Sequence, residues 1–206
     1  MNNMDMYYRI IPCSSKKNKP YVWEKSNVLD HKLKEQDFCK SMLIDEKEAT
    51  DIKIYSVDKY SSEDLDDVLQ GIMVYLPIIS KNVLNLVDTL NCSIQTFPVS
   101  VYSKNKLLST DYFIVNTLRE VDALDIKNSY YTTMGQILPS FCKSEEDKSK
   151  IFTIINPVLF AEKLNDSDIF RVKYDKNHMY VSGKFKNGFE KNNFSGWEFE
   201  KIEINQ

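Results

Sequence analysis

The chain of 206 residues is long enough to build one large domain or two small lobes without a disulfide or metal staple. With 42% apolar residues, 5 glycines and 6 prolines, it is not a disordered or linker-like chain, and glycine-rich phosphate-binding loops are disfavoured. The net charge of -3 argues against a general nucleic-acid binder, because phosphate contacts need clustered Lys and Arg and the one dense basic run, residues 14–20, is short.

The N-terminal third predicts two strands, a loop and a helix. In chain order these are a strand at residues 4–12, a loop at 13–26, a strand at 51–57 and a helix at 61–71, with 27–44 unassigned. The first strand ends at Pro12, and the helix would be capped by Ser61 or Ser62 and stop at Gly71. Acids in the first turn of that helix would be favoured by its dipole.

The middle of the chain predicts one or two buried strands, a helix and a hairpin. These elements cover residues 72–80, 80–91 and two strands at 92–103 and 110–118 that are joined by a turn at 104–109. Val83, Leu86, Val87 and Leu90 recur at spacings of three and four, which places them on one helix face. Ser80 stands where the cap of this helix belongs.

The C-terminal part predicts three strands and a second helix. The strands are expected at residues 150–156, 168–174 and 194–204, and the helix at 181–193. Residues 119–150 are expected to be irregular and surface-exposed, apart from the apolar stretch 134–141. His178 falls in a predicted turn.

An internal repeat relates Ser80 to Ser182, each followed by a helix pattern and a returning strand. At matching distances Val83 and Val87 correspond to Phe185 and Phe189, Ser93 to Ser195, and Phe97 to Phe199. We therefore predict an α+β fold, mainly antiparallel sheet with a few short helices, in one domain of residues 1–206. The repeat suggests two related strand-helix-strand lobes, of about residues 1–108 and 109–206.

Catalytic and metal-binding signatures are scarce. The two histidines, His31 and His178, have no ligand partner at metal spacing, and none of the motifs GxSxG, HExxH, GxxxxGK[ST] or GxGxxG occurs. The four cysteines are scattered without a CxxC pair: Cys13, Cys39, Cys92 and Cys142. We predict a cytoplasmic protein, because no signal peptide and no apolar run long enough to span a membrane is present. Its cysteines are then expected to be reduced thiols rather than two disulfides. We expect no metal and no cofactor.

Asp122 and Asp125, beside Glu120, are the one candidate carboxylate cluster. In a helical turn, carboxylates three residues apart share a face, as a glycosidase or a divalent-metal site would use. Asp in a turn more often accepts hydrogen bonds from backbone amides two or three residues later. We favour this structural interpretation, with Asp125 capping a turn over "IKNS".

Residues 72–204, about two-thirds of the chain, resemble a bacterial family of immunity proteins of polymorphic toxin systems, formerly a family of unknown function. The pattern that carries the resemblance is mostly structural: a strand ending in Ser before a helix, Gln-x-x-Pro, Tyr-x-x-x-Asn, Asp-x-x-Asp then Ser, Ile-Phe-Arg, Val-Ser before a second helix, and Gly-x-x-Phe. The matching residues are Ser80, Gln95, Pro98, Tyr112, Asn116, Asp122, Asp125, Ser129, Ile169, Phe170, Arg171, Val181, Ser182, Gly196 and Phe199.

The resemblance implies a non-catalytic protein that binds a cognate toxin domain in the producing cell and keeps it from acting. It implies no cofactor and leaves the oligomeric state open. The net charge and the short apolar runs predict no nucleic-acid partner and no membrane. Acids and aromatic side chains are the expected toxin contacts, because complementary charge accelerates encounter and aromatic residues anchor interfaces. The candidates are Asp64, Asp66, Asp67, Trp23 and Tyr60.

Two alternatives from other classes stay open. An enzyme with an unrecognised site around Asp122, Asp125 and Arg171 would bring these side chains together in a pocket. A non-catalytic module that binds a peptide or another ligand would carry a concave apolar groove.

Overall fold

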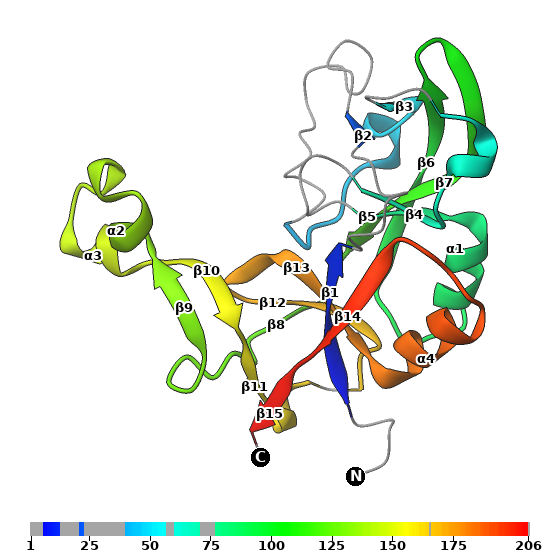
Figure 1. Cartoon of the computed structure of the whole chain (residues 1–206). Coiled ribbons are helices and arrows are strands. Elements are labelled where there is room, and N and C mark those ends of the chain that lie inside the picture. Colours follow the sequence, from blue (N-terminus) through cyan, green and yellow to red (C-terminus); the bar gives the residue numbers. More distant parts are fainter. Residues whose placement is uncertain are drawn as a thin grey trace.

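The computed structural model describes residues 6–12, 21–22, 40–56, 60–70, 77–164 and 166–205. This part of the chain contains two larger sheets, two further strand pairs and short helices (Figure 1). The architecture confirms the predicted α+β class.

The first sheet has the strand order β2-β3-β6-β7-β5-β4. Its strands are β2 (Tyr21–Val22), β3 (Ile52–Ser56), β4 (Val68–Gln70), β5 (Pro77–Ser80), β6 (Ile94–Ser103) and β7 (Lys106–Thr117). β3 runs parallel to β6, and the other neighbours are antiparallel. The predicted hairpin is confirmed as β6 and β7, but its turn is only Lys104 and Asn105, with Lys104 in the left-handed region at φ 54°.

The second sheet has the strand order β14-β1-β13-β12-β8. Its strands are β1 (Tyr7–Pro12), β8 (Glu120–Val121), β12 (Ile169–Val172), β13 (Asp175–Ser182) and β14 (Trp197–Lys201). The N-terminal strand β1 lies between β13 and β14, so Tyr8 pairs with Val181 on one side and with Lys201 on the other. A strand from the start of the chain thus completes a sheet built otherwise from its C-terminal half.

A hairpin extends away from the two sheets, at the left of Figure 1. It comprises β9 (Tyr130–Thr133), α2 (Met134–Ile137), η5 (Pro139–Phe141), α3 (Glu145–Ser149) and β10 (Ile151–Asn156), and we call residues 130–156 the arm. At its base β11 (Val158–Phe160) pairs in parallel with β15 (Glu203–Asn205). The short turns η3 (Glu46–Glu48), η4 (Ser62–Asp64) and η6 (Ala161–Lys163) complete the described elements.

The predicted unit of strand, serine-capped helix and returning strand occurs twice. Helix α1 (Lys81–Val87) begins after Ser80, whose Oγ accepts a hydrogen bond from the Val83 amide at 3.4 Å. Helix α4 (Gly183–Lys191) begins after Ser182, whose Oγ accepts from the Phe185 amide at the same distance of 3.4 Å. In each sheet one further strand, β7 or β1, lies between the two strands that flank the helix. The lobe boundary near residue 108 stays a prediction.

Asp67, just before β4, connects the two units, and we call its contacts the Asp67 seam. Its carbonyl accepts from the Ser80 amide at 2.7 Å, and its Oδ1 accepts from Ser80 Oγ at 3.3 Å. Its Oδ2 accepts from the amide of Ser195, which follows α4 in the other unit, at 3.1 Å. The adjoining Val68 amide donates to the Ser195 carbonyl at 3.0 Å.

Asp168, just before β12, makes the corresponding contacts in the second unit, and we call them the Asp168 seam. Its carbonyl accepts from the Ser182 amide at 3.0 Å, and its Oδ1 accepts from Ser182 Oγ. Its Oδ2 accepts from the amide of Asn91, which follows α1 in the first unit, at 2.9 Å. Each carboxylate therefore joins the cap serine of its own unit to the chain that leaves the helix of the other.

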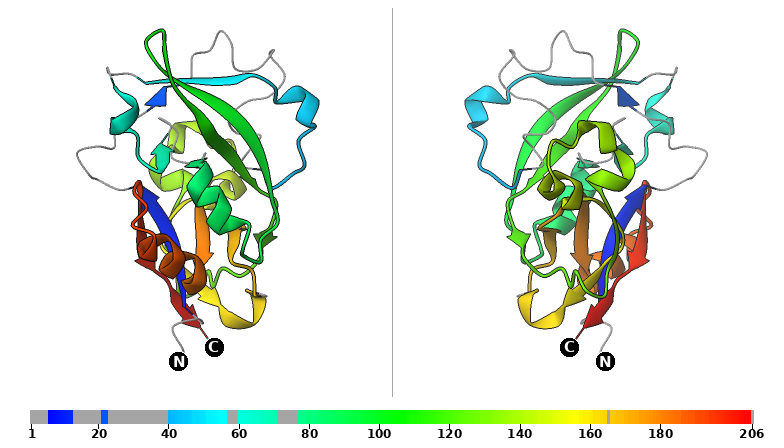
Figure 2. Two further views of the ribbon diagram at one scale, coloured as in Figure 1. Left: turned by 90° about the vertical axis from the view of Figure 1, so that its right-hand side faces the viewer. Right: turned by 90° about the vertical axis from the view of Figure 1, so that its left-hand side faces the viewer.

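Helices α1 and α4 pack against each other and face the viewer in the left panel of Figure 2. Val83, Val87, Phe185 and Phe189 belong to one buried cluster with residues of both sheets. The contact is close, because a Cβ added at Gly188 would lie 2.6 Å from Leu86 Cδ1. The two units therefore share this buried cluster.

The predicted helix at residues 61–71 is wrong beyond its first turn. The Asp64 carboxylate accepts from the Ser61 amide at 2.8 Å and closes a capping box on the single turn η4. Val68 and Leu69 are then buried in β4, which pairs with β5. Burial against β5 overrides the local helix signals. Gly71, the expected stop, lies outside the described residues.

Three further C-terminal predictions need correction. His178 lies in strand β13, and the turn before it is at Lys173 and Tyr174, with Tyr174 at φ 73°. The stretch 119–150, expected to be irregular, contains β8, β9 and the helices of the arm. The single strand expected at 194–204 is divided at Ile202, whose amide donates to the Tyr7 carbonyl at 3.0 Å. In the last case the deciding partner lies far away in the sequence.

Gly196 provides a test of the Asp67 seam. It has φ of 109°, and a Cβ there would lie 2.4 Å from the Val68 carbonyl oxygen. We expect Gly196→Ala to lower the free energy of unfolding by about 3 kcal/mol, through backbone strain and displacement of β4. Urea denaturation measures this change. A loss below about 0.5 kcal/mol would show that the close approach can relax without cost.

Asp168→Asn tests the second seam. The amide replaces one of two oxygens that accept hydrogen bonds in a site where Asp168 is 3% exposed. We expect a loss of about 1–3 kcal/mol in unfolding free energy, because one buried donor loses its acceptor. The matched control is Asp166→Asn, at an exposed position with φ of 47° that Asn tolerates, where we expect no significant change. Equal effects at the two positions would contradict a specific role for Asp168.

Candidate functional site

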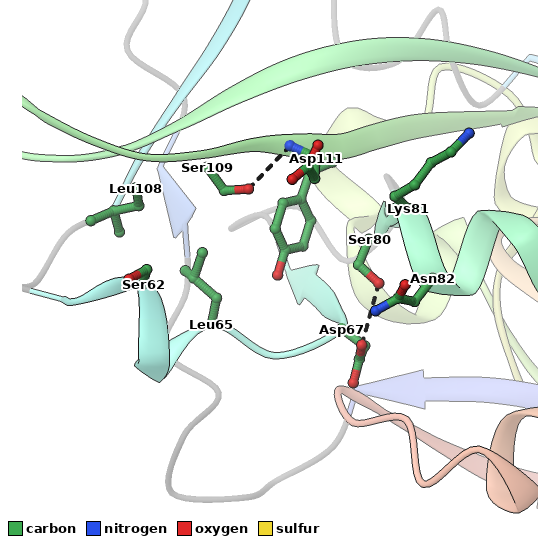
Figure 3. Close-up of a pocket in the computed structure, with 10 residues that line it drawn as sticks. Ser62, Leu65, Asp67, Ser80, Lys81, Asn82, Leu108, Ser109 and Asp111 are labelled. Carbon is green, nitrogen blue, oxygen red and sulfur yellow. Dashed lines mark hydrogen bonds between the residues drawn. The ribbon is translucent and has the colours of Figure 1, made fainter.

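An acidic pocket of about 440 Å³ lies where η4, the start of α1 and β7 meet (Figure 3). Leu65 and Leu108 line one side, and Asp67, Ser80 and Asn82 line the other. Ser62, Lys81, Ser109, Asp111 and Tyr112 complete the lining. The Lys81 side chain points away from the pocket, and its amine lies 5.4 Å from the centre of the Phe113 ring.

The electrostatic character of this pocket is negative. Burial raises the pKa of Tyr112, and the charges of Asp67, Asp66 and Asp111 raise it further. The Tyr112 hydroxyl therefore stays protonated and donates to the Asp66 carbonyl at 2.7 Å. The carboxylate of Asp111 is exposed and forms no ion pair with another described residue. A basic group is the complementary ligand for such a surface.

Of the predicted contact residues in the run 60–67, Asp67 lines this pocket, and two of the four are buried. Tyr60 is 9% exposed and Asp66 is 5% exposed, so both offer a partner little surface. Asp67 is bound in its seam, and Asp64 is exposed but bound to Ser61. Trp23 lies outside the described residues. The acids of this run lie close together in the chain, and the hydrogen bonds of Asp64 and Asp67 chiefly stabilise the fold.

Asp122 and Asp125 do not form a carboxylate pair. Asp122 is exposed and forms an ion pair of 2.8 Å with Lys173, which lowers the pKa of its carboxyl. Asp125 is buried and accepts from the backbone amides of Lys127 and Asn128, at 3.1 and 3.2 Å. Its other oxygen accepts from the side chains of Asn128 and Asn205, at 2.6 and 2.8 Å. These bonds lower the pKa of Asp125 and assign it to the turn.

Ser129 fastens the same turn to β11. Its Oγ accepts from the Val158 amide at 2.9 Å and donates to the Val158 carbonyl at 3.3 Å. The Asp125 amide also donates to the Val158 carbonyl, at 2.8 Å. The motif Asp-x-x-Asp then Ser thus builds the base of the arm.

The geometry gives no support to the alternative of a carboxylate enzyme. Arg171 is fully buried in β12, whereas the side chain of Asp122 is 61% exposed. The two pockets described here are not lined by Asp122, Asp125 or Arg171. Within the described residues, no three His, Cys, Asp or Glu side chains gather as a metal site would require.

Gln95 and Asn116, opposite each other in the β6–β7 hairpin, hold the segment before η3. Gln95 Oε1 accepts from the Ile44 amide at 3.0 Å, and its Nε2 donates to the Ile44 carbonyl at 2.6 Å. Asn116 Nδ2 donates to the Met42 carbonyl at 2.8 Å. Pro98 is exposed on β6 and faces Phe113 of β7 in the register. Gln95 and Asn116 therefore bind the backbone of the protein itself.

The surface that sequence reasoning missed is the arm. Five of the ten exposed large apolar side chains of the described residues lie on it: Tyr130, Ile137, Phe141, Phe152 and Ile155. The run "IFTIIN" at 151–156 predicts a strand but not its exposure. The apolar stretch 134–141, inside a region expected to be surface-exposed, was the available signal.

A model of the immunity protein family Imm11 matches residues 46–204. Because this match covers more than half of the chain, the protein belongs to the Imm11 family. The match confirms the resemblance seen over residues 72–204 and extends it to residue 46; β1 lies outside it. No curated protein matches the chain. No helix among the described residues is long and apolar enough to cross a membrane.

The two aspartates of the turn should behave differently on substitution. Asp125→Asn removes an oxygen acceptor that several donors surround, so we expect a lower melting temperature at pH 7. Because its pKa is lowered in the folded state, Asp125 stabilises the fold above the ordinary value of about 3.9 and loses this effect as the pH falls further. The deficit of the variant should therefore shrink below about pH 4.

Asp122→Asn is the matched control and should change the melting temperature little, since its ion pair is exposed. Thermal unfolding between pH 3 and pH 7 follows both variants. A larger effect at Asp122 than at Asp125 would contradict the turn assignment. Loss of an enzymatic activity in a variant that remains folded would instead support the enzyme alternative.

Proposed function

We propose that this protein binds the toxic domain of a cognate bacterial toxin in the cytoplasm of the producing cell and neutralises it. The observation that carries the proposal is the Imm11 family match over residues 46–204. Neutralisation proceeds by direct binding, without catalysis and without a cofactor. The engagement of Asp125 in a turn and the burial of Arg171 support a non-catalytic role.

The charge of the protein fits a basic toxin domain. The chain has a net charge of -3, and a pocket of negative potential attracts Lys and Arg on an approaching partner. The predicted contact set stays a hypothesis: Asp64, Asp66, Asp67, Trp23 and Tyr60. A peptide-binding module, the remaining alternative, needs a concave apolar groove, whereas both described pockets carry charged side chains.

Co-expression tests the proposal. The C-terminal domain encoded by the neighbouring reading frame is expressed in a bacterium with and without this protein, and growth and co-purification are measured. We expect the domain alone to arrest growth, and this protein to restore growth and to co-purify with the domain. If the domain is harmless, or kills equally in both cases without binding, the proposal is wrong.

A further inference from the structure

The arm carries an apolar surface that the fold itself does not cover. Tyr130 is 62% exposed, Phe152 39% and Ile155 38%, although strands of the arm and its base bury Ile154 and Leu159 in a core cluster. At the tip, Ile137 and Phe141 are also exposed, Phe141 by 73%. Apolar side chains that gather on one projecting element mark an interaction surface more often than single exposed ones do.

The base of the arm is held in a fixed position. Arg9 of β1 donates from Nη1 to the Ile154 carbonyl at 3.0 Å and from Nη2 to the Ile155 carbonyl at 2.8 Å. Its Nε donates to Glu200 Oε2 at 2.7 Å, and the guanidinium is buried. The contacts of Asp125 and Ser129 with Val158 secure the other side of the base. A surface that is ordered before binding loses less entropy when a partner docks.

A groove of about 340 Å³ lies at this base, between the arm and strands β14 and β15. Its lining includes Tyr130, Asn156, Glu200, Lys201 and Glu203. Glu200 is bound by Arg9, whereas Glu203 is exposed and forms no ion pair with any described residue. An Arg or Lys side chain can stack on the Tyr130 ring and pair with Glu203. Lys201 also lines the groove and adds a positive charge there, which disfavours a run of several basic side chains.

We infer that the arm and its base groove are the surface on which the toxin domain docks, an inference that rests on the proposed function. The matching surface of the toxin presents one Arg or Lys for the groove, flanked by apolar side chains that cover Phe152 and Ile155. An apolar centre with a polar rim is the usual composition of such contacts. The acidic pocket at the start of α1 lies on the other side of the molecule from the arm (Figure 1), and Asp67 there is bound internally.

A second copy of this chain fits the surface less well than a toxin domain. The strand Ile151–Asn156 contains no charged residue, so a symmetric contact between two β10 strands would leave Glu203 without a basic partner. A different protein can cover the arm and fill the groove together.

The test uses the toxin domain from the neighbouring reading frame as its probe. The variants of the arm and its base groove, called the arm variants, are Phe152→Lys, Ile155→Lys and Glu203→Lys, all at exposed positions. Their matched controls outside this surface and outside the acidic pocket are Leu43→Lys, at a side chain 78% exposed, and Glu46→Lys, at an exposed position in η3. We expect each arm variant to weaken the Kd at least about 30-fold, the effect of an interface hot spot, and each control to change it by less than about threefold.

Hydrogen exchange and light scattering keep the outcomes distinct. In the complex we expect slower amide exchange over residues 151–156 than in the free protein. The melting temperatures of the unbound variants should equal that of the wild-type protein. If the wild-type protein binds the toxin domain and the arm variants bind as the controls do, the arm assignment is overturned and the proposed function stands. If the wild-type protein neither binds nor rescues, the proposed function fails and the arm assignment fails with it. If light scattering shows that the free protein is a dimer and that Phe152→Lys makes it a monomer, the arm binds a second copy and the inference is overturned.

Discussion

Two aspartates that each bind both halves of a duplicated motif are the constraint on which this fold depends. Asp67 and Asp168 accept from the serine that caps their own helix and from the chain that leaves the helix of the other unit. The start of each helix is therefore bound to the aspartate of its own unit, and the chain that leaves it is bound to the aspartate of the other unit. The aromatic and aliphatic cluster between α1 and α4 is assembled by the same requirement.

These internal contacts of the carboxylates determine which side chains remain on the surface to bind a partner. The acids that stand out in the sequence are largely occupied: Asp67 in a seam, Asp64 in a capping box and Asp125 in a turn. Apolar side chains, which a sequence would assign to the interior, are instead displayed on the arm. The acids that the sequence suggests as contacts therefore mainly stabilise the fold. The apolar side chains of the arm, which the sequence does not suggest as contacts, are exposed.

The sequence predicted those elements whose signals are local. Helix α1 was predicted from an apolar stripe and a serine cap, α4 from its correspondence to α1 in the internal repeat, and the β6–β7 hairpin from two apolar runs around a polar turn. Strand β4 was missed because its residues are stabilised by β5, by core burial of Val68 and Leu69, and by Ser195, which is 128 positions away from Asp67. The exposure of the arm side chains could not be predicted for the same reason, because it depends on which distant elements cover β10. The turn role of Asp125 was predictable, because its backbone partners are two and three residues away.

The placement of β1 bears on how the molecule is made. This strand pairs with β13 and β14, which follow it far later in the chain. The second sheet cannot close until those two strands have been made, and sheets that wait for distant partners fold slowly. The same strand carries Arg9, which fixes the base of the arm. Closure of the second sheet and positioning of the arm therefore depend on one strand, β1.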